Sequence, residues 1–106
     1  MQIKIHDIEW KTGKVKGFLA KELLNLENGS LKLISAEPGN SYPMHTHPDK
    51  TEFAYVLEGN PQFKIGSSTY ESSPGDCFIF PQKEHHAIIN HTGGNCLMLI
   101  GAIKSV

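Results

Sequence analysis

Short runs of apolar and β-branched residues alternate with turn-forming residues along the chain. The turn signals are Asn28-Gly29, Pro38-Gly39, Gly59-Asn60-Pro61, Gly66-Ser67-Ser68, Pro74-Gly75, Pro81 and Gly93-Gly94. Strand-length runs that are bounded by Gly, Pro and Asn at short intervals are typical of an all-β sandwich or barrel. The pattern therefore predicts an all-β fold.

Two segments have the pattern of β-hairpins. Residues 23–36 place Asn28-Gly29 between two apolar runs, and this dipeptide is the strongest short-range hairpin signal. Residues 62–72 form the second candidate, in which Phe63 and Ile65 share one face of a strand because side chains alternate. Residues 20–27 also have helical propensity, but the turn and the strand that follow favour a strand there.

The remaining strands are expected at residues 52–59, 76–81, 86–90 and 95–103. The first 15 residues are expected to form an arm with one short strand. No linker, repeat or low-complexity tract interrupts the chain. A length of 106 residues with 39% hydrophobic and 20% charged residues suits one globular domain, so we expect a single domain over residues 1–106.

The charge pattern argues against several partners. The formal net charge is −1 at pH 7 and the basic residues are scattered, so we expect no nucleic acid and no membrane partner. No apolar run reaches the ~20 residues of a membrane span, and the N-terminal stretch lacks a signal-peptide core. Cys77 and Cys96 lie in apolar runs, which predicts two buried thiols and a cytoplasmic location.

The first candidate for chemistry is His45-Thr46-His47 followed by Glu52. In an extended chain His45 and His47 point to the same face with Cα atoms ~6–7 Å apart, so both imidazoles can reach one cation. Pro48 is expected to end this strand because it cannot donate to a ladder. Glu52 then opens the next strand and can face back toward the pair. An H-x-H pair is not specific by itself, since the chain has six histidines.

A second cluster lies in residues 75–90, where a strand and a proline turn lead to His85-His86. Adjacent residues in a strand point to opposite faces, so only one of these histidines can join an interior site. The alternation alone leaves open which one does.

Together the two segments resemble the motifs of the cupin superfamily, and the chain is similar to its small single-domain microbial members. The first motif, at residues 39–59, is matched by Gly39, His45, His47, Glu52 and Gly59. The second motif, at residues 75–90, is matched by Gly75, Pro81, His86 and Asn90. Lys83 stands where that motif has a glycine, which predicts a slightly different turn with the same ligands.

The resemblance implies a double-stranded β-helix, or jelly-roll barrel, with a short N-terminal arm. It implies that His45, His47, Glu52 and His86 hold one divalent transition metal ion (Fe, Mn, Ni, Cu or Zn), which suits three imidazoles and a carboxylate. Four protein ligands leave two positions open on a six-coordinate ion. Further candidates for the pocket or the surroundings of the ligands are Tyr42, Phe80, His85 and Asn90, and the apolar strand faces are expected to line the pocket.

Three functions remain open at this point. The leading hypothesis is a metal-dependent enzyme that acts on a small organic molecule, with a non-haem dioxygenase as the best single class. The second is a non-redox isomerase, decarboxylase or lyase, for which Lys50, Lys64 and Lys83 are candidate phosphate-binding groups. The third is a small-ligand-binding or sensor protein without catalysis. We also expect a homodimer, because residues 52–59 carry apolar side chains on both faces of a strand.

Overall fold

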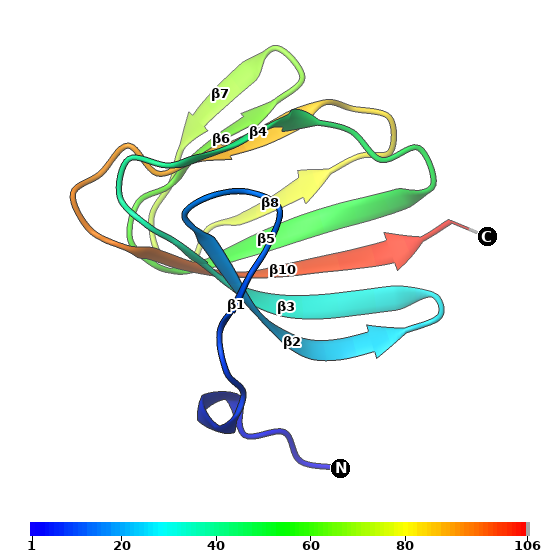
Figure 1. The fold of residues 1–106 in the computed structure, drawn as a ribbon. Coiled ribbons are helices and arrows are strands. Elements are labelled where there is room, and N and C mark those ends of the chain that lie inside the picture. Colours follow the sequence, from blue (N-terminus) through cyan, green and yellow to red (C-terminus); the bar gives the residue numbers. More distant parts are fainter. Residues whose placement is uncertain (106) are drawn as a thin grey trace.

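The computed structural model describes residues 1–105 and consists of two antiparallel sheets that face each other (Figure 1). The larger sheet has the order β1-β2-β3-β10-β5-β8 and the smaller β4-β9-β6-β7. In the larger sheet the strands are β1 (Lys11–Thr12), β2 (Phe18–Leu26), β3 (Gly29–Ala36), β5 (Lys50–Glu58), β8 (Cys77–Phe80) and β10 (Cys96–Lys104). In the smaller sheet they are β4 (Ser41–His45), β6 (Gln62–Ile65), β7 (Ser68–Glu71) and β9 (His86–Ile89).

This arrangement confirms the predicted jelly-roll fold. Both hairpins are present, as the antiparallel pairs β2–β3 and β6–β7. The segment with helical propensity is a strand, because its partner β3 follows directly after the turn and pairs with it from Gly29 to Ala36. Distant strands also meet, since β10 lies between β3 and β5.

The hydrophobic core lies between the two sheets. Phe63 comes from the smaller sheet, while Val56, Phe80 and Met98 come from the larger, and all four are almost fully buried. The ring of Phe63 stacks on that of Phe78, with centroids 4.3 Å apart. Strand alternation directs these side chains inward, so they fill the space between the two sheets.

The N-terminal arm contains a short 3₁₀ turn, η1 (Ile5–Asp7), which projects from the edge of the larger sheet below β1 (Figure 1). The Lys21 ammonium holds it there, because its Nζ donates a hydrogen bond of 3.1 Å to the carbonyl oxygen of Ile5. The same Nζ lies 4.9 Å from the centre of the Trp10 ring, a cation–π contact. Lys21 is thereby buried with its charge compensated by polar and aromatic groups.

The expectation of two buried thiols is wrong for one cysteine. Cys96 is fully buried, but Cys77 is exposed, and neither forms a disulfide. The reason is the alternation along β8, which directs Phe78 and Phe80 inward and Cys77 outward. Within residues 1–105, no helix is long and apolar enough to cross a bilayer.

Candidate metal centre

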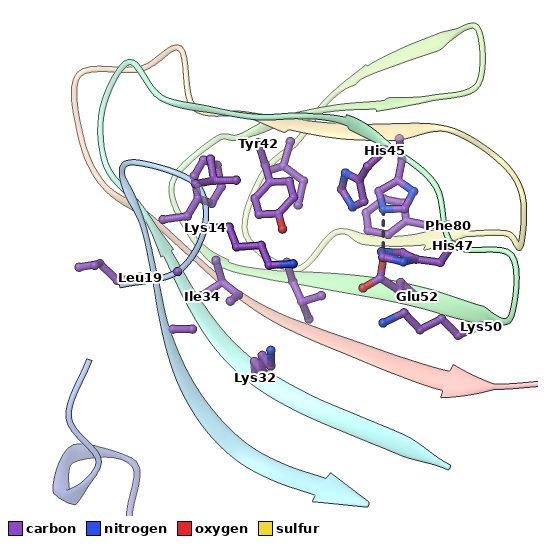
Figure 2. Close-up of a pocket in the computed structure, with 17 residues that line it drawn as sticks. Lys14, Leu19, Lys32, Ile34, Tyr42, His45, His47, Lys50, Glu52 and Phe80 are labelled. Carbon is purple, nitrogen blue, oxygen red and sulfur yellow. Dashed lines mark hydrogen bonds and ion pairs between the residues drawn. The ribbon is translucent and has the colours of Figure 1, made fainter. Parts of the chain in front are cut away.

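The four candidate ligands come from three strands and one loop. His45 is the last residue of β4, His86 the first of β9, and these two residues are register partners. Glu52 lies near the start of β5 in the opposite sheet, and His47 lies in the loop between β4 and β5. The cluster is therefore assembled where strand ends from the two sheets approach each other (Figure 2).

The donor atoms converge closely. One donor atom from each of His45, His47, Glu52 and His86 lies within 4.8 Å of the others. The Nε2 atoms of His47 and His86 lie 2.9 and 3.1 Å from Glu52 Oε1. Three imidazole nitrogens and one carboxylate oxygen in such a cluster fit a first-row divalent metal. The structure thus brings together all four residues that the motifs nominate, and no other group of three or more potential ligands occurs within residues 1–105.

Neighbouring groups orient the imidazoles. His45 Nδ1 donates a hydrogen bond of 2.8 Å to the carbonyl oxygen of Pro43, which leaves Nε2 as the ring nitrogen that could bind a metal. The Phe80 ring stacks on His86, with centroids 4.3 Å apart and planes at 6°. Tyr42 contacts His45 at a centroid distance of 4.8 Å. These contacts fix the rings before any ligand arrives.

Burial and charge keep the donors in the forms that metals need. Burial lowers the pKa of His45 from its ordinary value of 6.5, because desolvation disfavours the charged imidazolium. Burial opposes the charge of Glu52, but its hydrogen bond with His86 and the nearby charges of His47 and Lys50 still lower its pKa from 4.5. Neutral His45 and ionised Glu52 at pH 7 can both donate lone pairs to a cation.

The loop that carries His47 is tied to the turn between β8 and β9. The backbone N–H of Lys83 donates a hydrogen bond of 3.0 Å to the carbonyl oxygen of His47. Lys83 has φ 66°, and it is the only non-glycine residue with positive φ in the described chain. Lys83 thus adopts the left-handed conformation that glycine, the residue of the motif at this position, favours.

The strand before the ligands differs from expectation. It was predicted to extend to Pro48, but β4 ends at His45, because its partner β9 begins at His86 and offers no further pairing. The register also shifts between Tyr42 and His45, which marks a β-bulge. The bulge lets Tyr42 and His45 line the same pocket although they are three residues apart.

A pocket of about 440 Å³ opens beside the cluster, and all four candidate ligands line it (Figure 2). Tyr42 and Phe80 line it as well, whereas His85 and Asn90 do not. His85 is exposed. Asn90 is fully buried and hydrogen-bonds to Ala36, Thr92 and Gly94.

The pocket walls only partly follow the sequence prediction. Of the apolar segments expected to line it, residues 54–57 and 63–65 do not border it, because their inward side chains lie in the core. Phe80 and Ile100 are the contributions of the other two segments. The remaining apolar wall comes from β2, β3, β9 and the loop before β2, through Val15, Phe18, Leu19, Ala20, Ile34 and Ile88.

Sequence reasoning also missed two charged residues of the pocket. Of the three lysines singled out as phosphate-binding candidates, Lys50 lines the pocket, but Lys64 and Lys83 do not. Lys14 and Lys32 line it instead. Alternation along β3 with Ile34 could have placed Lys32 on the inner face. No sequence signal placed Lys14, which lies in the irregular loop between β1 and β2.

Comparison with known proteins shows the family. A family model described as "Cupin domain" matches residues 32–100, and the chain belongs to this cupin family. A germin-like protein of Oryza sativa subsp. japonica is 35% identical over 91 residues, which cover 77% of this chain. The match spans 40% of that protein, so the chain corresponds to less than half the length of this relative.

Solved structures show the same fold. A protein from Thermotoga maritima, described as a predicted oxalate decarboxylase, superposes with a TM-score of 0.92 at 21% identity, covering 99% of this chain and 100% of that one. A sugar phosphate isomerase of the cupin superfamily from Silicibacter pomeroyi superposes with a TM-score of 0.88 at 21% identity, covering 99% of this chain and 76% of that one. At this identity the likeness establishes the fold, while chemistry must be argued from the site.

Proposed function

We propose that this cupin is a metal-dependent enzyme acting on a small organic molecule, with a non-haem dioxygenase as the best single class. The observation that carries the proposal is the His45, His47, Glu52 and His86 cluster in the wall of a 440 Å³ pocket. Four protein donors would not saturate a six-coordinate ion, and such an incomplete protein ligand set distinguishes a reactive site from a closed structural one.

The donor set fits a resident divalent metal. His45 is oriented by Pro43, and the oxygen of Glu52 already lies within hydrogen-bond distance of two imidazoles. His45, His47, Glu52 and His86 would hold the metal, which would supply the redox chemistry of the reaction. The chain's own groups shield this site, because Phe80 covers one face of His86 and the pocket walls around it are largely apolar.

Metal analysis of anaerobically purified protein tests the proposal, followed by a screen for oxygen consumption with the metal found. We expect one divalent transition metal per chain and oxygen uptake with at least one small organic acid, enol or thiol. His47→Ala should abolish metal binding. Thr46→Ala is the matched control and should not, because Thr46 is not a donor of the cluster. Protein without stoichiometric metal would contradict the proposal, and ligand binding without product would favour a sensor role.

A non-redox isomerase, decarboxylase or lyase is the second candidate. The observation in its favour is the set of lysines in the pocket, Lys14, Lys32 and Lys50, because sugar phosphates need cationic partners for their phosphate group. In such an enzyme the metal serves as a Lewis acid for a substrate carbonyl. Turnover that persists with zinc and is unchanged when oxygen is removed would favour this candidate over the dioxygenase.

We further propose that the protein is a homodimer formed through the outer face of its larger sheet. Tyr55, Leu57, Ile79 and Ile103 are exposed large apolar residues on β5, β8 and β10, three strands that are adjacent in this sheet. Exposed large apolar residues gathered on adjacent strands suit an interface between two subunits. Light scattering at micromolar concentration should give a dimeric mass, and Ile79→Lys should give a monomer. A monomeric mass for the unaltered protein would contradict the proposal.

We also propose that the protein is cytoplasmic. Both cysteines are free thiols, and the exposed Cys77 would be open to oxidation outside a reducing compartment. Thiol labelling of freshly lysed cells should find Cys77 reduced, while a large oxidised fraction would argue for another compartment.

A further inference from the structure

The pocket contains positively charged side chains in addition to the candidate metal ligands. Lys14, Lys32 and Lys50 all line it, and Glu52 is the only acidic residue among its lining residues. Lys50 and Glu52 lie two residues apart on β5, so the charge of Lys50 is offset by this carboxylate. Lys14 and Lys32 have no such partner in the pocket.

The two remaining lysines are uncompensated. Within residues 1–105, no lysine nitrogen lies within 4.0 Å of a carboxylate oxygen, since the ion pairs present all involve histidine. Glu22 is the register partner of Lys32 on β2, but it does not line the pocket. Figure 2 shows the Lys14 side chain extending into the pocket below Tyr42, with Lys32 on the β3 side. Cations that border a partly apolar pocket without counter-charges favour an anionic ligand.

The Tyr42 hydroxyl adds a third polar group. Figure 2 shows its oxygen directed into the same space as Lys14. Apolar side chains, including Ile34, Ile88 and Ile100, line the same pocket. The pocket thus combines the His–Glu cluster, two further cations and a hydroxyl group with an apolar wall.

We propose that this pocket binds an organic anion with two acidic groups joined by an apolar body. One acidic group lies at the His–Glu cluster and the other at Lys14 and Lys32, with the Tyr42 hydroxyl as a further donor. The inference deepens the proposed function and rests on it, because the first acidic group is placed at the metal. Both carboxylate and phosphate groups have the oxygen chemistry that lysine ammonium groups recognise.

The size of the pocket argues for the apolar body. A volume of about 440 Å³ lies within the ~300–1,000 Å³ of sites that enclose drug-sized ligands. A diacid without a carbon spacer leaves the isoleucine side chains of the wall uncovered. A ligand that fills the pocket adds the burial of apolar surface to its two charge contacts.

Binding titrations on the metal-loaded protein test the inference. The probes are a series of linear α,ω-dicarboxylates from ethanedioate to decanedioate, the ω-phosphonocarboxylates of matching length, and the neutral diols of matching length. We expect a dicarboxylate or phosphonocarboxylate of intermediate length to bind about tenfold or more tightly than its diol and than ethanedioate. The dicarboxylate and phosphonocarboxylate arms distinguish carboxylate from phosphate-type recognition.

The variants are Lys14→Met and Lys32→Met, with Lys16→Met as matched control. Lys16 lies in the same loop as Lys14 and is exposed, but it does not line the pocket. Each pocket variant should lose about tenfold in affinity for the best dianion and nothing for the diol, with its metal content unchanged. The control should bind like the unaltered protein, and added salt should weaken dianion binding.

Three results would overturn the inference: equal affinity for dianion and diol, unchanged dianion affinity in both pocket variants, or no probe bound below about 10 mM.

Titrations of the His47→Ala variant separate this inference from the proposed function. If the His47→Ala variant lacks metal, this variant should still bind a monocarboxylate. Its affinity for the monocarboxylate should fall when Lys14 or Lys32 is also replaced. Conversely, oxygen uptake by the metal-loaded protein without any preference for anions would leave the dioxygenase proposal standing and reject this one.

Discussion

At the scale of single residues, Asn90 has a structural role although it lies close in sequence to the candidate metal ligand His86. Asn90 belongs to the same motif as His86, yet its side chain faces protein backbone and not the pocket. Its amide nitrogen donates to the carbonyl oxygens of Ala36 and Gly94, at 2.9 and 2.8 Å. Its oxygen accepts from the backbone N–H and the hydroxyl of Thr92, at 3.0 and 2.6 Å. Asn90 therefore joins β3, β9 and the loop before β10.

Asn90→Ala should destabilise the protein while leaving its metal site intact. The variant leaves the buried carbonyl groups of Ala36 and Gly94 without their amide partner, which costs about 1–3 kcal/mol for each unsatisfied group. Chemical denaturation should show a loss of about 2–4 kcal/mol in the free energy of unfolding. Metal content per folded chain should remain that of the unaltered protein, and its loss would instead place Asn90 in the metal site.

Lys83→Gly should stabilise the protein slightly. A non-glycine residue in the left-handed region costs roughly 1–2 kcal/mol, and part of this is offset because glycine makes the unfolded chain more flexible. We expect a gain of about 0.5 kcal/mol or more in the free energy of unfolding. Lys83→Val is the opposing variant, since a β-branched side chain tolerates this conformation poorly. It should destabilise the turn and, through the Lys83–His47 hydrogen bond, weaken metal binding. A more stable Val variant would contradict this account.

At the scale of the strands, the sequence predicted the fold better than the pocket. Hairpin turns and alternation gave the strands, and the two motifs nominated the residues that converge. The bulge between Tyr42 and His45 could not be predicted, because it depends on where β9 begins and how it pairs with β4. Lys14 lies in a loop whose course no periodicity determines. Local patterns thus predict strands, whereas pocket walls depend on pairing between distant strands.

Gly101→Ala tests the close contact between β5 and β10 on the outer face of the larger sheet. Gly101 is the register partner of Phe53, whose ring covers it, and an added Cβ would lie 2.3 Å from Phe53 Cζ. The ring must move, and we expect a loss of about 1 kcal/mol, in the lower range of overpacking costs. Denaturation of the single and double variants should show that Phe53→Ala removes most of this penalty. Additive losses would refute the contact, and metal content should be unaffected.

At the scale of the whole molecule, a metal ion at the candidate metal centre would link the stability of the fold to proton binding. Its donors come from both sheets, so a bound cation would hold the two sheets together. Anything that binds the folded state alone stabilises it, by about 2.7 kcal/mol at a free concentration a hundred times Kd. Protons compete for the same nitrogen and oxygen atoms.

The stability gained from metal should therefore disappear in acid. The pKa of folded His45 lies below 6.5, so stability is lost as the pH falls through 6.5, where the unfolded chain binds the proton first. Folded Glu52 has a pKa below 4.5, so its contribution is present above 4.5 and is lost as the pH falls below that value. Thermal melts with and without metal should differ at pH 7.5 and converge toward pH 4.5. The His47→Ala variant should show no difference at any pH, and a difference that persists below pH 4 would contradict the proposed donors.

The pocket wall contributed by residues 13–20 offers a way to change which ligands the pocket accepts. The part matched to the family, residues 32–100, contains all four candidate metal ligands, whereas Lys14, Val15 and Phe18 precede it. The candidate metal centre and one side of the pocket thus come from separate stretches of chain. Exchanging residues 13–20 alone should redirect what the pocket accepts without rebuilding the centre, so the barrel is a scaffold on which selectivity can evolve or be engineered independently of reactivity.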